Sequence, residues 1–347
     1  MMLRQRYLKD KKEFIAVDVF KVICAVNIAA MHLMALADPC PDLIFWFNQV
    51  VARLGVPFFL VSSGFFLYDK LNDREKVLRY VQRLAQLYAL YTLIHLTLMW
   101  ESYSGTRIRE KLLELVKDIF VRGSYVQFWY FLSLMIAVGM LYLLMEHFKI
   151  KEKSLVILAV ILYLIGVMEN AYGTALLEVP VAGSMIRFCR EVFITNRNGI
   201  FFAFPFVLMG MLLKKYAEKI KKGPYFLLFL GGLALMTVEA YFIKGISGQE
   251  AFSMIATTPV AIAFLFLGAC FVTVPDKCRG VGKFMRNLSM LIFGWHMYIH
   301  AEYGYIVYYW FDSHIYFLCI MAATIGISVA IFFLSRFKIF EWLKYLY

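Results

Sequence analysis

Three polar residues lie in an apolar stretch near the N-terminus, where ionisable side chains are costly to bury. Residues 14–36 are long enough to cross a bilayer, and they contain Asp18, Lys21 and His32. Lys21 and His32 are eleven residues apart, so in a helix they share one face and lie ~16 Å apart along its axis. Ionisable groups inside a membrane span suggest a functional site. The alternative is that Lys21 extends to the inner membrane surface and His32 is a hydrogen-bonded core residue.

A second apolar stretch, residues 44–68, contains Arg53 near its middle. A buried guanidinium keeps its charge, so it needs an anion, backbone carbonyls or water. Pro57 removes a backbone donor and can kink the helix. Ser63 lies in a Ser-Ser-Gly sequence that suits close helix packing or an entering ligand. The alternative is a packing kink with a structural ion pair.

Two further apolar stretches contain buried ionisable groups. His296 and His300 are four residues apart, so they share a helix face. A metal would need additional ligands on that face, and none is present, so we predict no metal. Glu239 is an isolated carboxylate in residues 225–243. Because cations outnumber anions in this polar set, we expect a polar cavity that receives a negatively charged ligand.

Polar and aromatic residues also begin two of the apolar stretches. Trp129 opens residues 126–146, where aromatic residues commonly lie at the membrane surface. Arg197 and Asn198 precede residues 199–213, and with free backbone N–H groups they could hold an anionic or polyhydroxylated group. A simple helix cap formed by Asn198 is the alternative.

The composition predicts a protein that crosses the membrane many times. The 347 residues are 62% hydrophobic and 17% charged, whereas soluble domains carry ~25% charged residues. Ten apolar runs are each near the ~17–25 residues of a spanning helix. The runs are 14–36, 44–68, 79–100, 126–146, 154–168, 199–213, 225–243, 252–274, 287–310 and 315–337. We therefore expect an all-α polytopic membrane bundle of about ten helices.

The distribution of basic residues predicts the orientation. With the N-terminus in the cytoplasm, the inner segments hold 25 Lys and Arg and the outer segments hold 9. This asymmetry favours two cytoplasmic termini, and it also argues against nucleic-acid binding as the reason for the net charge of +12. We divide the chain into a basic tail (1–13), a single transmembrane domain (14–338) and a short cytoplasmic tail (339–347). An amphipathic helix near residues 107–120 is expected on the outer surface.

The ordered motifs resemble those of the membrane-bound acyltransferase family 3. The motifs are D-x-x-K-x10-H, RLGVPFFLVSSGFF, FWYFLSL, RNGIFFAFPFVLMG and LSMLIFGWH, and their order matches over most of the chain. The resemblance implies a ten-helix core that takes an acyl group, usually acetyl, from cytoplasmic coenzyme A. It also implies transfer to a hydroxyl on the other side, usually of a glycan.

The resemblance implies roles for particular residues. His32 matches the essential histidine of the first helix, and Lys21 stands where arginine is usual, which replaces a bidentate fork with a point charge. Arg53 and His296 match the second-helix and late motifs, while Phe293 stands where tyrosine is common. His32 would be the general base, and Arg53 or His296 would stabilise the thioester oxyanion.

The remaining predicted site residues surround this centre. Coenzyme A phosphates would meet cations near the inner surface, although these cations could equally set the topology alone. The residues assigned to the donor are Ser63, Arg74, Lys76, Arg79 and Arg83, and those assigned to the acceptor are Asp18, Trp129, Glu239, Arg197, Asn198 and His300.

The sequence thus predicts a multi-pass acyltransferase of the bacterial cytoplasmic membrane. Its partners would be acetyl-coenzyme A, the lipid bilayer and a glycan or small hydroxylated acceptor outside. One alternative is a carrier of small molecules such as amino acids, because ionisable groups across a bundle are also typical of transporters. Another is a structural partner in an envelope complex.

Overall fold

The protein is helical throughout the part that the structure describes. The computed structural model describes residues 14–33, 40–193, 196–275, 278, 280–310 and 313–347, and these include no β-strand. The helices of the first half are α2 (Ile15–His32), α3 (Pro41–Trp46), η1 (Phe47–Val51), η2 (Ala52–Leu54), α4 (Gly55–Leu67), η3 (Tyr68–Lys70), α5 (Arg74–Ile94), α6 (Leu96–Ser102), α7 (Ile108–Lys117), η4 (Asp118–Arg122), α8 (Trp129–Tyr142) and η5 (Leu143–His147).

The second half contains the longest described helix, α15 (Val281–Trp310). The helices of this half are α9 (Glu152–Asn170), α10 (Gly173–Leu176), α11 (Pro180–Phe193), η6 (Gly199–Ala203), α12 (Phe204–Lys215), α13 (Tyr225–Ser247), α14 (Thr258–Phe271), α15 (Val281–Trp310), α16 (Ser313–Leu334) and η8 (Lys338–Leu346). Each of the ten predicted apolar runs therefore contains helix.

The helices support a membrane protein. Among the described residues, five helical segments are long and apolar enough to span a bilayer. They are Ile15–His32, Pro41–Lys70, Trp129–His147, Tyr225–Ser247 and Ile315–Leu334. Thr258–Phe271 is apolar but shorter. The count of ten spans and the cytoplasmic position of both termini stay predictions.

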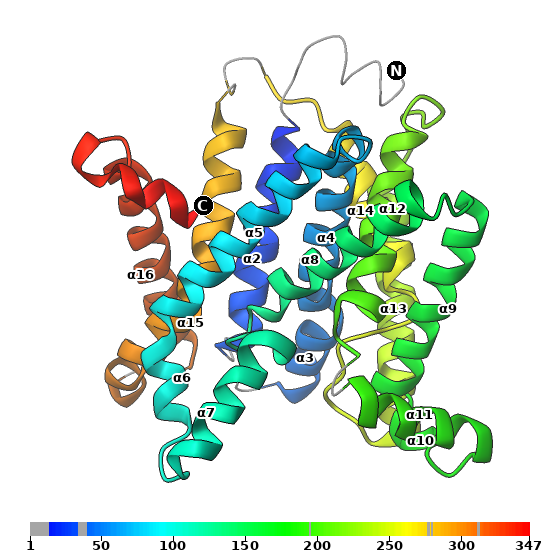
Figure 1. Cartoon of the computed structure of the whole chain (residues 1–347), viewed down its shortest axis with the longest axis horizontal. Helices are drawn as coiled ribbons and strands as arrows, with labels where there is room; N and C mark the ends of the chain where they lie inside the picture. Colours follow the sequence, from blue (N-terminus) through cyan, green and yellow to red (C-terminus); the bar gives the residue numbers. More distant parts are fainter. Residues whose placement is uncertain (1–13, 34–39, 194–195, 276–277, 279, 311–312) are drawn as a thin grey trace.

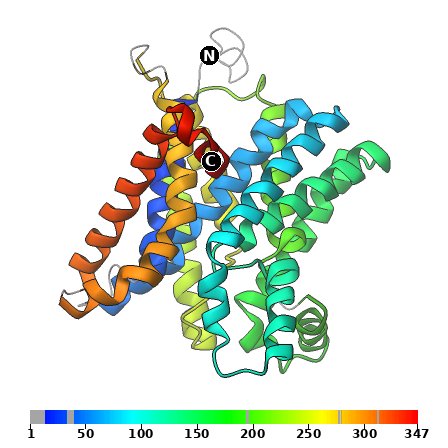
Figure 2. The ribbon, with the colours of Figure 1, turned by 60° about the vertical axis from the view of Figure 1, so that its left-hand side comes forward.

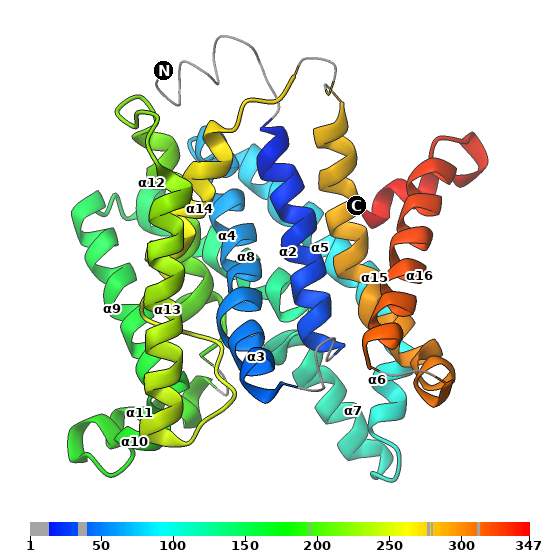
Figure 3. The same cartoon turned by 180° about the vertical axis from the view of Figure 1, so that it is seen from behind.

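Helix α2 lies at the centre of the bundle. It packs against α15 on one side and α4 on the other, and α4 in turn packs against α12 (Figures 1 and 3). The α4–α12 contact is close because both helices present glycine. A Cβ on Gly64 would lie 2.0 Å from the Val207 carbonyl oxygen, and one on Gly210 would lie 2.0 Å from that of Val61. The predicted small surface around Ser63 therefore serves close packing at Gly64.

The second span is interrupted where its polar residues lie. Between α3 and α4 the backbone passes through a π-helical turn, η1, and a 3-10 turn, η2. Pro57 cannot donate a hydrogen bond to the Arg53 carbonyl four residues earlier, so the regular ladder is broken at this point. The irregular turns place Gln49 and Arg53 on the inner side of the bundle.

The two ends of the bundle differ in character. The beginnings of α2 and α15 lie at the end that is uppermost in Figure 1, and α6, α7, α10 and α11 extend from the opposite end. Helix α7 is the predicted amphipathic helix, with Leu112, Leu113 and Val116 all exposed.

Helices α15 and α16 form a pair on one flank (Figure 2).

Candidate functional site

His32 lies on the wall of a small pocket between α2, α4 and α8. We call this the His32 pocket, and its cavity volume is about 40 Å³. By the volume that one buried water occupies, this space holds only a few small atoms. Its walls are formed by Ile28, Met31, His32, Ala52, Arg53, Val56, Pro57, Gln127, Trp129, Arg197, Phe202, Ser253 and Phe293. The polar part of this wall contains two guanidiniums, one imidazole, one amide, one hydroxyl and the indole N–H of Trp129, and the described wall residues include no carboxylate.

Arg53 is held in the wall by neutral groups. Its guanidinium donates to Gln49 Oε1 at 3.1 Å and to Ser253 Oγ at 3.5 Å. Gln49 Oε1 also accepts from the backbone N–H of Phe252 at 3.2 Å, which fixes the orientation of the amide. The Nε atom of Arg53 is buried and has no hydrogen-bond partner among the described residues. A positive charge held by neutral partners is suited to attracting an anionic group.

Arg197 lies against the indole of Trp129. The guanidinium carbon is 5.0 Å from the ring centroid, which is a cation–π geometry. Trp129 also makes an edge contact with Phe202, with the ring centroids 5.6 Å apart. The predicted site residues Trp129 and Arg197 therefore come together with His32 and Arg53 in one pocket, although α2, α4, α8 and the segment before η6 are far apart in sequence.

His296 lies directly behind His32. The two rings stack with centroids 5.7 Å apart and planes inclined by 30°. His296 is fully buried, and its Nδ1 lies 3.0 Å from the Ile292 carbonyl oxygen. Because a carbonyl only accepts, Nδ1 carries the proton, and a neutral ring then presents Nε2 as an acceptor. The neutral ring is consequently unsuited to donate to an oxyanion.

Asp18 and Lys21 lie in a different place, nearer the beginning of α2. Lys21 Nζ is 3.1 Å from Asp18 Oδ1, and Arg286 of α15 donates to both oxygens of Asp18 at 3.2 and 2.9 Å. Asp18 is 1% exposed and Lys21 is 9% exposed. Neither residue belongs to the wall of the His32 pocket. The cluster links α2 to α15.

Three other predicted residues have local partners. Glu239 accepts from the backbone N–H groups of Ala256 and Thr257 at 2.8 and 2.9 Å, so it holds the loop before α14. His300 Nδ1 contacts the hydroxyl of Tyr316. Asn198 caps η6 by accepting from the backbone N–H groups of residues 200 and 201, as in the capping alternative.

The residues assigned to the donor lie at the same end of the bundle as the beginning of α2. Ser63 Oγ is 3.5 Å from the Tyr130 hydroxyl. Lys76 pairs with Asp73 at 2.8 Å, and Arg83 donates to the Lys344 carbonyl at 3.0 Å. Arg79 pairs loosely with Glu75, and Arg74 is exposed at the first turn of α5.

Sequence reasoning missed two polar residues of the pocket wall. Gln127 is 2% exposed, and neither its Nε2 nor its Oε1 has a partner among the described residues. Ser253 accepts from Arg53. Gln127 opens the apolar run that contains Trp129, and a lone amide at the start of such a run was the available signal. Nothing in the sequence around Ser253 distinguishes it from other loop serines.

A second cavity adjoins the His32 pocket. This vestibule has a volume of about 270 Å³ and shares Trp129 and Arg197 with the His32 pocket. Its walls are formed by Met99, Ser102, Asp118, Arg122, Gly123, Ser124, Tyr125, Val126, Trp129 and Arg197. It therefore lies at the end of the bundle that carries α6 and α7. Arg122 pairs with Asp118 at 3.0 Å and with Glu114 at 2.7 Å, and hydrogen bonds from Lys117 and Arg122 lower the pKa of Glu114.

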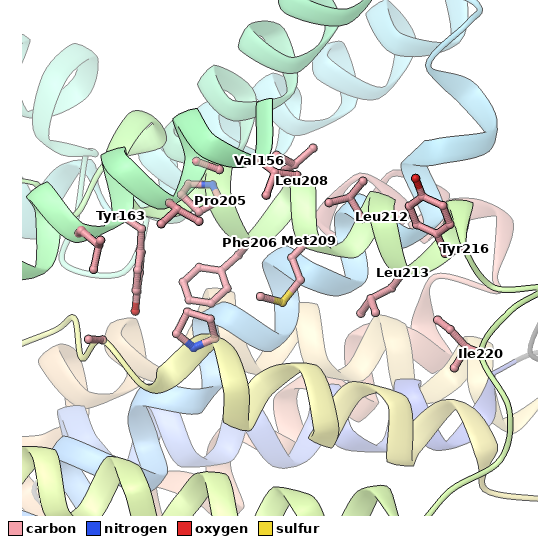
Figure 4. A pocket seen from close by; sticks show the side chains of 15 residues that line it. Val156, Tyr163, Pro205, Phe206, Leu208, Met209, Leu212, Leu213, Tyr216 and Ile220 are labelled. Atoms are coloured by element: carbon pink, nitrogen blue, oxygen red, sulfur yellow. The ribbon is translucent and has the colours of Figure 1, made fainter. Parts of the chain in front are cut away.

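A larger cavity lies elsewhere in the described part of the chain and is apolar. A groove of about 440 Å³ runs between α9, α12 and the start of α14 (Figure 4). Phe206, Met209 and Leu213 point into it, and only Tyr163 and Tyr216 bring polar atoms (Figure 4). A groove of this composition suits hydrocarbon chains and lacks groups for catalysis, so the smaller His32 pocket is the better candidate for chemistry.

Comparisons with known proteins identify a family for most of the chain. A family model described as an acyltransferase domain matches residues 14–333. The chain is also similar to a serine/alanine racemase of Enterococcus gallinarum, with 29% identity over 266 residues, which is 72% of this chain and 36% of that protein. An amino-acid racemase of Enterococcus faecalis is 25% identical over 259 residues, again 72% of this chain and 36% of that protein.

The chain spans only about a third of the length of the curated relatives that it matches. Another amino-acid racemase of Enterococcus faecalis is 26% identical over 220 residues, which is 63% of this chain and 30% of that protein. No solved structure matches the chain significantly.

Proposed function

Because the chain belongs to the membrane-bound acyltransferase family 3, we propose that it moves an acyl group across the membrane to a hydroxyl. In this proposal the donor is acetyl-coenzyme A in the cytoplasm of a bacterium. The acceptor is a glycan or another small hydroxylated molecule outside the cytoplasmic membrane. The observation that carries the proposal is the convergence of His32, Arg53 and Arg197 in one pocket whose described wall residues include no carboxylate.

The chemistry of the pocket fits acyl transfer from a thioester. His32 accepts the proton of the acceptor hydroxyl while the oxygen of that hydroxyl attacks the thioester carbonyl. The positive charge of Arg53 stabilises the oxyanion of the tetrahedral intermediate. The carbon–sulfur bond then breaks, and the leaving thiolate receives the proton from His32. The products are an ester and free coenzyme A.

The size of the pocket favours a short acyl group. A volume of about 40 Å³ has room for an acetyl group but not for coenzyme A itself. We propose that the nucleotide part stays at the inner end of the bundle, where the cations Lys21 and Arg286 lie beside Asp18. Arg74, Lys76 and Arg79 are further cations near this end.

The vestibule is the proposed entrance for the acceptor. Its volume of about 270 Å³ approaches the ~300 Å³ at the lower end of small-molecule sites. Tyr125, Trp129 and the paired Asp118 and Arg122 combine aromatic rings with hydrogen-bonding groups, which suits a hydroxylated ligand. The acceptor would pass alongside Trp129 and Arg197, which line both cavities, to bring one hydroxyl to His32.

A second candidate function follows from the relatives. Proteins named as serine/alanine and amino-acid racemases contain a segment similar to this chain. The chain could accordingly be a carrier that binds an amino acid in the same pocket, with its carboxylate between Arg53 and Arg197. An amino-acid hydroxyl, as in serine, would also be a chemically possible acceptor.

Purified protein supplied with labelled acetyl-coenzyme A tests the proposal. We expect the wild type to release coenzyme A and label the acceptor, and we expect His32→Ala to abolish both while the protein stays folded. His147→Ala is the matched control, because His147 is exposed at the end of η5. Uptake of labelled amino acids into proteoliposomes without acetyl transfer would support the carrier. Comparing the envelope glycans of strains with and without the protein would identify the acceptor.

A further inference from the structure

Gln127 is the one wall residue of the His32 pocket whose side-chain amide is buried and wholly unpartnered within the described part of the chain. It is 2% exposed, and both Nε2 and Oε1 are shielded from solvent. It lies in the turn just before α8, where the backbone N–H of Tyr130 bonds its carbonyl at 3.4 Å. Trp129, Arg197 and His32 are its neighbours on the pocket wall.

A comparison with Gln49 shows why this is unusual. Gln49 is buried to a similar degree, at 5% exposure, but its Oε1 accepts from both Arg53 and the backbone of Phe252. Buried polar groups in proteins are nearly always hydrogen-bonded, because leaving a donor or acceptor unmet costs free energy. An apolar side chain of the same size would avoid that cost at position 127. The amide therefore lacks a partner among the described residues, and a bound ligand would supply one.

We propose that Gln127 is a catalytic residue whose Nε2–H group donates to the acyl carbonyl oxygen, and this rests on the proposed acyl transfer. Three observations support it. The amide lines the same cavity as His32, it has a free donor, and it is neutral. His296 cannot fill this role as a neutral ring, because its Nδ1 proton is committed to Ile292.

The donor acts on the oxygen that becomes negative. When the acceptor oxygen attacks the thioester carbonyl, the carbonyl π electrons move to its oxygen, and the Gln127 N–H bond strengthens as charge develops there. Arg53 supplies the positive charge through its unpartnered Nε, so the two side chains form a pair of donors. The bond from Gln127 persists until the carbon–sulfur bond breaks and the carbonyl reforms.

Substitution of Gln127 separates catalysis from stability. Gln127→Met removes a buried amide that has no protein partner, so we expect the melting temperature to stay equal to or above that of the wild type. We expect kcat for acetyl transfer to fall by roughly 10²–10³, as on losing one oxyanion donor. The KM values should change much less than kcat, because the bond is strongest in the transition state.

Three further variants make the test specific. Gln127→Glu keeps the shape but replaces the donor with an acceptor-only carboxylate, so it should be at least as impaired as Gln127→Met. Gln49→Met should lower the melting temperature, because it removes a partner from Arg53 and from the backbone of Phe252. Gln86→Met on the exposed face of α5 should change neither property.

The results for these variants distinguish a failure of the donor role of Gln127 from a failure of acyl transfer itself. Wild-type kcat in Gln127→Met, or activity retained in Gln127→Glu, would overturn the assigned donor role while leaving acyl transfer intact. A fall in melting temperature equal to that of Gln49→Met would show that Gln127 is structural, and it would also overturn the inference. A wild-type protein that transfers no acetyl group would overturn both this inference and the proposed function.

Discussion

His32 and His296 stack with ring centroids 5.7 Å apart and planes inclined by 30°, although they come from α2 and α15, which are far apart in sequence. His296 is fully buried and anchored to the Ile292 carbonyl, whereas His32 reaches the pocket. The buried ring therefore limits the rotation of the ring that faces the substrate, and this relationship motivates the first prediction.

Removing the ring of His296 should disorient His32. We expect His296→Ala to lower kcat by roughly 10²-fold, the scale of a misplacement of about 1 Å. His296→Phe keeps a flat ring of similar size, so we expect its activity to stay within about tenfold of the wild type by the same geometric argument. Steady-state acetyl transfer by both variants checks this. Equal losses in the two variants would show that Nε2, and not the stacking, is what matters.

Trp129 should control access of the acceptor. Trp129→Ala removes the indole beneath the Arg197 guanidinium, an interaction worth about 0.5–2 kcal/mol. We expect KM for the acceptor to rise by roughly 2–30-fold, since that energy corresponds to this factor. KM for acetyl-coenzyme A should hardly change. The control is Trp100→Ala, because Trp100 makes a similar contact with Lys111 on α6 and α7 but lines neither cavity.

Met31 should limit the length of the acyl chain that the pocket accepts. The pocket of about 40 Å³ ends partly on this side chain, so we expect acetyl to be preferred over butyryl. Met31→Ala should shift the preference toward butyryl, with a change of ~10–200-fold in the ratio of kcat/KM values. Met135→Ala, outside the pocket, is the control. Unchanged selectivity in Met31→Ala would place the acyl group elsewhere.

Asp18 should be essential for stability. Asp18→Asn would leave Lys21 and Arg286 without their shared anion, and breaking a buried ion pair costs about 3–5 kcal/mol. We expect a lower melting temperature and a lower yield of folded protein in detergent. Asp42→Asn should have no such effect, because Asp42 is 76% exposed and lies 3.8 Å from Lys244. An unchanged melting temperature in Asp18→Asn would assign the pair a purely functional role.

The sequence by itself determined the helical class, the membrane setting and the family. Long apolar runs specify helices, because only a helix satisfies every backbone group inside lipid. The alternation of apolar runs with basic segments predicts an orientation without any tertiary contact. Local rules also offered the Asn198 cap as one of two alternatives, since a cap forms between residues two or three positions apart.

Only the tertiary structure decided which polar residues meet. Lys21 and His32 share one helix, yet Lys21 pairs with Asp18 and Arg286 while His32 joins Arg53 and Arg197. The unmet amide of Gln127 was equally hidden, because a missing hydrogen bond becomes visible only when every neighbour is in place. Helix periodicity gives the face of a residue, but the partner on that face depends on how helices distant in sequence pack together.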